Sequence, residues 1–290
     1  MNSKRKLVIV FVGGSSHVLR AREALLSKLL LDVLPSVRTI SWDEAPSGEE
    51  LRSIAAADVI DAVVLIDHGP FSGGVPEGTP FEEAVRQEAL RAIVTLELQR
   101  RALRTVFLSS STIHSWNNVL GTMIDPNAHV EYGQPPSSCL LLPSSPLIIS
   151  YLQPLFASIA GLTDLRIVWP REVFYNGDIP GEALPPIVEV AGRARIIAYG
   201  PYQPLPTGRW RAKACVGFGD DVGKLPFIIE ADTGDAVSRG YFEVTRGGIF
   251  SVEFDFQVSD WTLPVEFRLI SQDSALEGRM ALIEIELRRL

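Results

Sequence analysis

The chain carries two patterns of apolar and polar residues, and they meet near residue 200. From Lys6 to about Gly200, short apolar runs such as 7–12 and 61–67 alternate with longer segments whose apolar residues recur at helical spacing. Continuous apolar runs are typical of strands buried on both faces, with helices as the connections between them. This part therefore predicts a Rossmann-like, doubly wound parallel sheet covered by helices.

A Pro-rich stretch, 201–208, separates that part from a second pattern, which has a period of two. In segment 248–258, Phe and Val alternate with Ser, Glu, Asp and Gln. Such alternation predicts a strand with one buried and one solvated face, and it recurs in several segments separated by turn-forming residues. We therefore expect an antiparallel β-sandwich after the parallel sheet. The expected fold class is α/β plus all-β, with domains at 1–203 and 204–290.

The amino-acid composition argues against several classes of protein. The chain has 290 residues, 46% of them apolar, so it can bury a sizeable core, and its net charge of −8 argues against nucleic acid binding. Cys139 and Cys215 lie far apart with no Cys/His cluster, which argues against a disulfide framework and a metal site. The apolar run at 7–12 is too short for a secretory signal, and no run reaches membrane-spanning length. We expect a cytoplasmic protein without a membrane partner.

Glycines, serines and acids follow the first predicted strands. Gly13 and Gly14 lie where a dinucleotide-binding turn lets a pyrophosphate approach the start of a helix, although a serine-capped tight turn explains them equally. An acid after the second strand, Asp43, could bind a ribose, or it could cap a helix. We predict an NAD or NADP site, without a metal. Its candidate residues are Gly13, Gly14, Ser15, Ser16, Asp43, Asp67, His68 and Ser109.

Several segments together resemble one family. In chain order they are 13–16 (GGSS), 61–68 (DAVVLIDH), 87–102, 105–114 (TVFLSSSTIH), 164–178 and 181–200. This order resembles the extended short-chain dehydrogenase/reductase family, the NAD-dependent epimerases and dehydratases that act on sugar nucleotides. The resemblance covers about Lys6 to Gly200. It implies a nucleotide or sugar-nucleotide ligand, and it implies that Ser111 is the active-site serine that hydrogen-bonds the substrate.

The residue pair that provides the family's catalytic base is missing from this chain. Its chemistry needs a Tyr-x-x-x-Lys pair, in which the lysine lowers the pKa of the phenol. Here Leu147 falls at the tyrosine position and Tyr151 at the lysine position, and no lysine occurs between Lys28 and Lys213. We therefore expect a degenerate, non-catalytic relative that binds a dinucleotide or sugar nucleotide, or acts in a complex in glycan metabolism. One alternative is an active epimerase, dehydratase or reductase with an atypical base, whose rate depends on Ser111.

A further alternative is a glycan-binding or adaptor protein. Most aromatic residues of the predicted sandwich fall on inward positions, which indicates core packing. Tyr241 and Trp261 are the candidates for an exposed aromatic platform on which sugar rings could pack. The segment looks like an immunoglobulin-type or carbohydrate-binding β-sandwich, and fold alone does not decide function. A homodimer or a partner protein is also compatible with its exposed faces.

Overall fold

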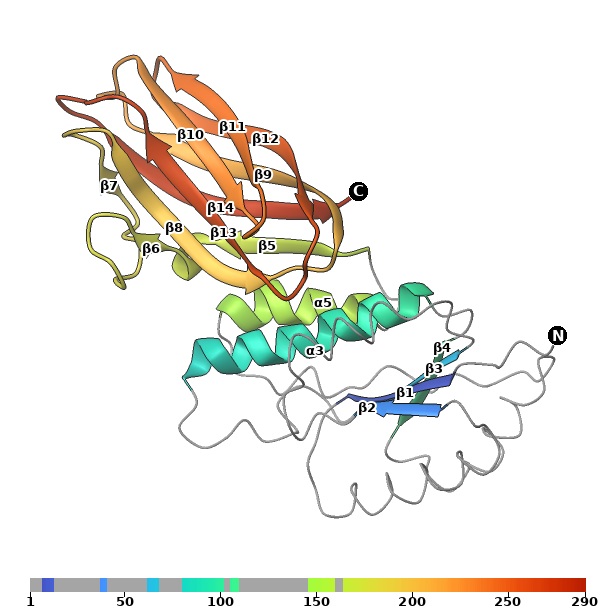
Figure 1. Ribbon diagram of the computed structural model, residues 1–290. Helices are drawn as coiled ribbons and strands as arrows, with labels where there is room; N and C mark the ends of the chain where they lie inside the picture. Colours follow the sequence, from blue (N-terminus) through green and yellow to red (C-terminus); the bar gives the residue numbers. More distant parts are fainter. Residues whose placement is uncertain are drawn as a thin grey trace. The chain divides into compact units, whose positions relative to one another are not determined.

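The computed structural model describes residues 7–12, 37–40, 62–67, 80–101, 105–109, 146–159 and 164–290 (Figure 1). The chain divides into two compact units, Met1–Leu142 and Pro143–Leu290. Predicted site residues that fall between the described ranges are Gly13, Gly14, Ser15, Ser16, Asp43, His68 and Ser111.

The first unit contains a four-stranded parallel sheet with the order β2-β1-β3-β4. Its strands are β1 (Leu7–Val12), β2 (Val37–Ile40), β3 (Ala62–Asp67) and β4 (Thr105–Ser109). All three pairings are parallel, as the continuous apolar runs predict. An order with the first strand inside the sheet is found in doubly wound α/β folds. The finer assignment to a Rossmann-like nucleotide-binding domain stays a prediction.

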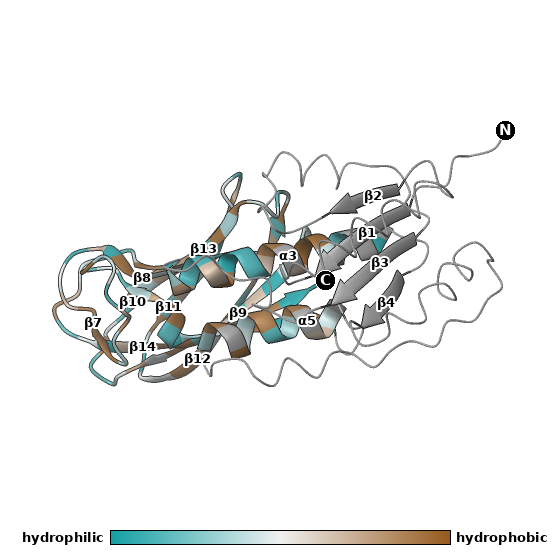
Figure 2. Cartoon of the chain, turned by 90° about the horizontal axis from the view of Figure 1, so that it is seen from below, coloured by the Kyte–Doolittle hydropathy of each residue, from teal (hydrophilic) through white to brown (hydrophobic). Residues whose placement is uncertain are grey.

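A long helix, α3 (Phe81–Arg101), connects β3 to β4 and contacts β1 and β3. Its first turn carries Glu82 and Glu83, whose negative charges are favourable at a helix N-terminus. Glu83 also accepts a hydrogen bond from Arg86 Nε at 2.9 Å, one turn along the helix. Brown and teal residues both occur along α3, as expected for a helix that buries only part of its surface (Figure 2).

The second unit begins with a helical segment that belongs to the sandwich. It consists of a π-helical turn, η3 (Ile148–Leu152), followed by α5 (Gln153–Ile159), and both contact strand β5. Tyr151 is fully buried, and its hydroxyl donates to the carbonyl oxygen of Pro204. Its ring meets Trp169 edge to face, with 6.1 Å between centroids. The position aligned with the family's lysine therefore holds a buried packing residue.

The rest of the second unit is a β-sandwich of two antiparallel sheets. One sheet has the order β11-β10-β13-β8-β6. Its strands are β6 (Tyr175–Asn176), β8 (Arg195–Pro204), β10 (Leu225–Asp232), β11 (Val237–Val244) and β13 (Pro264–Ser271). The other sheet has the order β12-β9-β14-β5, and β7 also pairs with β14. Its strands are β5 (Arg166–Pro170), β7 (Val188–Glu189), β9 (Gly208–Phe218), β12 (Gly248–Val258) and β14 (Arg279–Arg289).

Aromatic side chains from both sheets form the core of the sandwich. Phe267 of β13 meets Trp169 of β5 at 5.7 Å and Phe256 of β12 at 5.6 Å, both edge to face. Each of these side chains is buried, and burying one contributes about 2–3 kcal/mol. The period-two alternation in 248–258 is confirmed, because Phe250, Phe254 and Phe256 pair in register with the inward-facing Val216, Ala212 and Trp210 of β9.

The predicted domain boundary at 203/204 is corrected by the structure. Strands β5 to β8 were expected in the α/β domain, yet β5 pairs with β14 and β8 pairs with β13 inside the sandwich. The division falls between Leu142 and Pro143. The boundary was predicted too late because Val168 in β5 and Ile196 in β8 are apolar residues on outward positions. Such residues make half-buried strands look continuously apolar. The family resemblance over 164–200 therefore falls on antiparallel strands.

Candidate functional site

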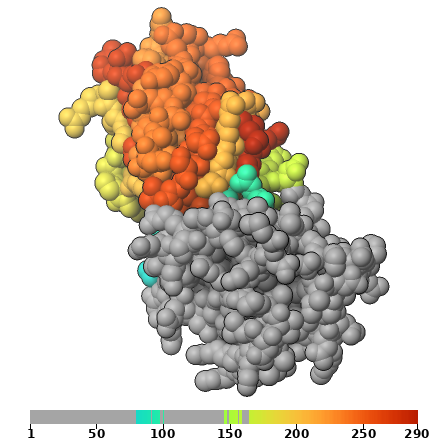
Figure 3. Space-filling view, turned by 45° about the vertical axis from the view of Figure 1, so that its right-hand side comes forward, coloured from blue at the N-terminus to red at the C-terminus, as the bar shows by residue number. Residues whose placement is uncertain are grey.

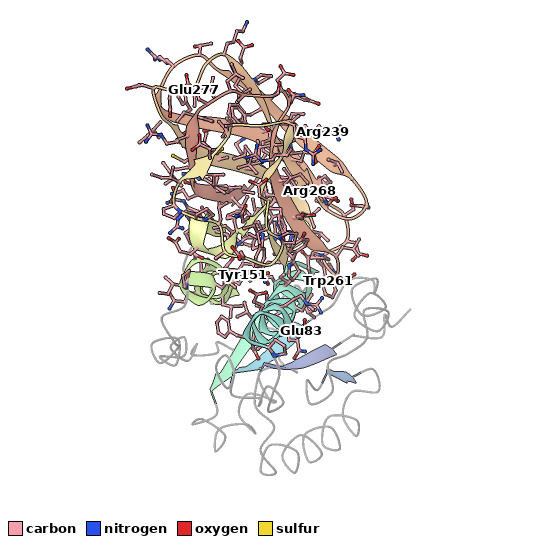
Figure 4. All side chains as sticks on the ribbon, turned by 90° about the vertical axis from the view of Figure 1, so that its left-hand side faces the viewer. Glu83, Tyr151, Arg239, Trp261, Arg268 and Glu277 are labelled. Atoms are coloured by element: carbon pink, nitrogen blue, oxygen red, sulfur yellow. The ribbon has the colours of Figure 1, made fainter. Side chains whose placement is uncertain are left out.

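A row of side chains crosses the outward face of the β11-β10-β13-β8-β6 sheet. Residues paired across neighbouring strands lie side by side on one face of a sheet. The register aligns one such residue from each strand: Tyr175, Tyr199, Arg268, Glu230 and Arg239. We call this set the cross-strand row and the whole outward face of this sheet the tyrosine face. Figure 4 shows the labelled Arg239 and Arg268 on the same side of the sandwich.

Ion pairs connect the acidic and basic members of this face. Arg239 Nε donates to Glu230 Oε1 at 2.6 Å, and Arg268 Nη1 lies 3.8 Å from Glu230 Oε2. Arg268 Nη2 also lies 3.0 Å from Asp232 Oδ2 and donates to Glu266 Oε2. The hydrogen bond with Glu266, followed by the charges of Glu266 and Asp232, raises the pKa of Arg268. Arg268 therefore contacts three carboxylates.

Two of these carboxylates are buried. Glu230 is 7% exposed and Glu266 is 8% exposed, whereas the guanidinium of Arg268 reaches the surface. A buried carboxylate is stable only where charged or hydrogen-bonding partners compensate for its lost hydration. The arginines provide that compensation, so the charges of this face are held in place by one another.

Three tyrosines adjoin the ion pairs, and we call Tyr175, Tyr199 and Tyr202 the tyrosine cluster. The ring centroids of Tyr175 and Tyr199 are 5.5 Å apart, and those of Tyr199 and Tyr202 are 6.1 Å apart. The Tyr202 hydroxyl donates to Glu266 Oε1 at 2.7 Å. Burial and then this hydrogen bond raise the pKa of Tyr202 well above its usual value. The tyrosine cluster is thereby linked to the charged residues.

The backbone of Tyr202 is strained. Its φ of +59° lies in the left-handed region, where a residue with a side chain costs about 1–3 kcal/mol. Contacts of the ring with Tyr199 and of the hydroxyl with Glu266 hold this conformation. Strained residues of this kind cluster at binding and active sites, which favours this face as a functional site.

An apolar row lies beside the cross-strand row. The register aligns Ile196 with Ile270, Ile270 with Ile228, and Ile228 with Tyr241. Tyr241 is 64% exposed, which makes it the most exposed aromatic residue among those that the structure describes. The predicted platform residue Tyr241 therefore lies on the tyrosine face, and its role in binding stays a prediction.

Trp261, the other predicted platform residue, is buried. It is only 4% exposed, so its ring offers no face to a ligand, and this prediction is corrected. Its turn is closed by Asp260, whose carboxylate accepts hydrogen bonds from the backbone N–H and the hydroxyl of Thr262. Sequence reasoning took the turn-like segment as exposed, but a tight turn can direct a large apolar side chain into the core. The labelled Trp261 can be followed in Figure 4.

The outward face of the β12-β9-β14-β5 sheet, which we call the ion-pair face, has a different character. Arg209 and Arg211 both bind Asp255, each at 2.7 Å. Arg166 Nη2 donates to Glu286 at 2.6 Å, and the hydrogen bond from Arg166 lowers the pKa of Glu286. Among the described residues of these strands, no outward position holds an aromatic side chain.

In the predicted nucleotide site, only two candidates fall within the described residues. Asp67 ends β3 and Ser109 ends β4, and the two are register partners, with Val12 on the other side of Asp67. The structure therefore brings these two positions together at the carboxyl edge of the parallel sheet. The NAD or NADP site and the role of Ser111 stay predictions.

Sequence reasoning missed the cross-strand row. The sequence did not single out Arg268 or Arg239, and nothing in it placed Tyr175 or Tyr199 beside them, because both tyrosines fell in segments expected in another domain. Among the described residues, no group of three or more His, Cys, Asp or Glu side chains could hold a metal ion. In the same part of the chain, no helix has the length and apolar character needed to cross a bilayer.

No protein-family model and no curated protein match the chain. The sandwich is similar to solved carbohydrate-binding modules. A family 61 module (TmCBM61), solved with β-1,4-galactotriose, matches with 12% identity and a TM-score of 0.28, covering 43% of this chain and 88% of that one. The C-terminal family 6 module of LamC, a laminarinase from Zobellia galactanivorans, matches with 16% identity, a TM-score of 0.29 and coverages of 43% and 99%.

A family 22 xylan-binding module of Xyn10C from Paenibacillus barcinonensis matches with 9% identity, a TM-score of 0.29 and coverages of 43% and 94%. Identities and TM-scores this low do not define a ligand for this chain. Any argument about a ligand must therefore start from the side chains of the sandwich itself.

Proposed function

We propose that this chain binds a polysaccharide on the tyrosine face. The observation that carries the proposal is the combination, on one exposed face, of the tyrosine cluster and Tyr241 with the ion pairs around Arg268. A sugar ring has apolar C–H surfaces that pack on aromatic rings, and hydroxyls that both donate and accept hydrogen bonds. Planar guanidinium and carboxylate groups provide directional partners for such hydroxyls.

The dimensions of the face suit an extended chain. Neighbouring strands are about 4.8 Å apart, so five strands place the outermost members of the cross-strand row roughly 19 Å from each other. The row is continuous in register from β6 to β11. A polysaccharide that lies across the strands meets tyrosines at one end, Arg268 and Glu230 in the middle and Arg239 at the other end, with Tyr241 beside its path.

Affinity electrophoresis of the full chain tests this proposal. Gels would contain β-1,4-galactan, laminarin or xylan, and titration with matching oligosaccharides would follow. We expect at least one polysaccharide to retard the chain, and Tyr241→Ala to weaken binding about tenfold, because an aromatic contact is worth about 1.4 kcal/mol. A matched control is Ile249→Ala, which removes an exposed apolar side chain from the other sheet.

Two outcomes would overturn the proposal. One is that no polysaccharide in the panel retards the chain. The other is that Tyr241→Ala and Ile249→Ala weaken binding equally, since that result would place the ligand elsewhere on the surface.

A second candidate function is nucleotide binding by the first unit. It is favoured by one observation, the side-by-side position of Asp67 and Ser109 at the carboxyl ends of parallel strands, where doubly wound domains bind their ligands. We propose a non-catalytic NAD(P) or sugar-nucleotide site there, because the chain has no lysine between Lys28 and Lys213. Mass spectrometry of the purified chain tests this directly. Absence of bound NAD(P), together with no binding at millimolar concentration, would exclude the dinucleotide.

A further inference from the structure

Arg268 and Arg239 are the two guanidinium groups of the cross-strand row, and both are already paired. Sites that recognise anions leave the fork of an arginine free for the ligand's oxygens. Here Arg268 Nη2 contacts Glu266 and Asp232, while Arg239 Nε donates to Glu230. An anionic ligand that approaches either arginine therefore also approaches the carboxylates already bound to it.

The charged groups around Arg268 and Arg239 form a centre with an excess of negative charge. Three carboxylates, Glu230, Asp232 and Glu266, surround two guanidiniums, so the centre has a net charge of −1. Two of the carboxylates are buried and cannot turn away into water to make room. A carboxylate or sulfate group on a ligand would therefore meet like charge at short range, where repulsion is large.

A neutral hydroxyl meets no such barrier. It can accept from a guanidinium N–H that is not engaged and donate to a carboxylate oxygen at the same time, so that no ion pair has to break. Asp232 illustrates how the acids are fixed, because its Oδ1 accepts the backbone N–H of Gly234 at 2.9 Å while its Oδ2 lies beside Arg268. The same pairs that exclude anions therefore stay in place when a neutral sugar binds.

From this arrangement we infer that the tyrosine face selects uncharged polysaccharides, and that the pairing of Arg268 by Asp232 and Glu266 sets this specificity. The inference rests on the proposed polysaccharide binding and adds the class of ligand. Arg268 is on this account a specificity-determining residue, and the carboxylates beside it act as the barrier to uronate and sulfate groups.

Polymers that share a backbone and differ in charge test the inference with the full chain. The pairs are hydroxyethylcellulose with carboxymethylcellulose, and laminarin with chemically sulfated laminarin. We expect the neutral member of a recognised pair to bind at least about tenfold more tightly, because like charges are brought together by the anionic member. The difference should shrink as salt is raised, since salt screens charge repulsion.

The variant Asp232→Asn removes one carboxylate from Arg268 and keeps the size of the side chain. We expect its binding to the anionic polymer to increase about fivefold, while binding to the neutral polymer changes by less than about twofold. The matched control is Glu253→Gln, which removes one carboxylate from the ion-pair face and changes the chain's net charge equally. Thermal melting of both variants checks that they are folded.

The outcomes separate the two proposals. If no neutral polysaccharide binds, the polysaccharide function itself is wrong. If polysaccharides bind and the anionic members bind as tightly as the neutral ones, the function stands and the selectivity inference is overturned. The inference is also overturned if Glu253→Gln increases anionic binding as much as Asp232→Asn does, because the effect would then come from overall charge.

Discussion

The two outward faces of the sandwich arise from the same alternating pattern and differ in what surrounds their charges. On the ion-pair face, long side chains such as Arg209 and Arg211 reach over the sheet to Asp255 and remain largely in water. On the tyrosine face, Glu230 and Glu266 are buried, and the Tyr202 hydroxyl donates to Glu266, whereas the buried carboxylate of the ion-pair face, Glu286, is paired with Arg166 and Arg288. Alternation thus creates an outward face, and the neighbours of each charge determine whether that face is only solvated or can also recognise a ligand.

The ion pairs of the two faces should also differ in what they contribute to stability. The orange segment that contains β10 to β13 forms a continuous surface of the second unit (Figure 3). Exposed ion pairs contribute little to stability, commonly 0–1 kcal/mol, because water already solvates their charges well. Buried charged groups are costly to leave without a partner. Substitutions on the two faces should therefore differ in their effect on stability.

The largest effect is expected from Arg268→Met. This change keeps the apolar stem and removes the cation that contacts three carboxylates, so Glu230 and Glu266 lose compensation while buried. We expect the free energy of unfolding to fall by about 2 kcal/mol, measured by urea unfolding. Arg211→Met on the ion-pair face is the control, and its unfolding midpoint should hardly move. Equal shifts in the two variants would contradict the comparison.

A smaller effect is expected from Tyr202→Phe. The change removes the hydroxyl that donates to Glu266 and leaves the ring in place, so the free energy of unfolding should fall by about 1–2 kcal/mol. The raised pKa of Tyr202 in the folded chain means that the stability it contributes is complete below pH 10 and is lost as the pH rises further. Urea unfolding at pH 7 and at pH 11 measures both parts. If the wild-type chain and Tyr202→Phe lost the same free energy of unfolding between pH 7 and pH 11, Tyr202 would not be the group that titrates.

The smallest effect is expected from Asp255→Asn on the ion-pair face. The hydrogen bond from Arg211, followed by that from Arg209, lowers the pKa of Asp255, so its contribution is present above the ordinary value of 3.8 and is lost as the pH falls below it. Because both arginines remain largely in water, we expect the melting temperature at pH 7 hardly to change and the loss of stability in acid to be weaker than in the unchanged chain. Thermal melting between pH 7 and pH 3 measures this. A loss at pH 7 as large as that of Arg268→Met would remove the distinction between the faces.

Several elements could be predicted because their cause is local. The apolar run at 7–12 predicted a strand of a parallel sheet, and the alternation at 248–258 predicted β12 together with the side of it that is buried. The helix between β3 and β4 was also expected, since its apolar residues recur at helical spacing over several turns. In each case the order of apolar and polar side chains follows the period of the helix or strand, so the sequence alone predicts the element.

Other features could not be read in this way. Ile196 and Val168 are apolar residues on outward faces, so their strands looked buried on both sides, and the domain boundary was placed too late. Trp261 sits in a segment rich in turn-forming residues, yet its side chain is buried. Tyr202 has a left-handed backbone conformation, which the presence of a tyrosine at that position does not predict.

The sequence by itself determined which positions of each sandwich strand face inward, because alternate side chains of a strand point to opposite sides whatever the strand pairs with. Only the tertiary structure decided which outward side chains are neighbours. Tyr199 lies beside Arg268, and Arg268 beside Glu230, because β8, β13 and β10 pair in that order and register. Pairings between strands so far apart in the chain depend on the packing of the whole core, and no local pattern contains that information.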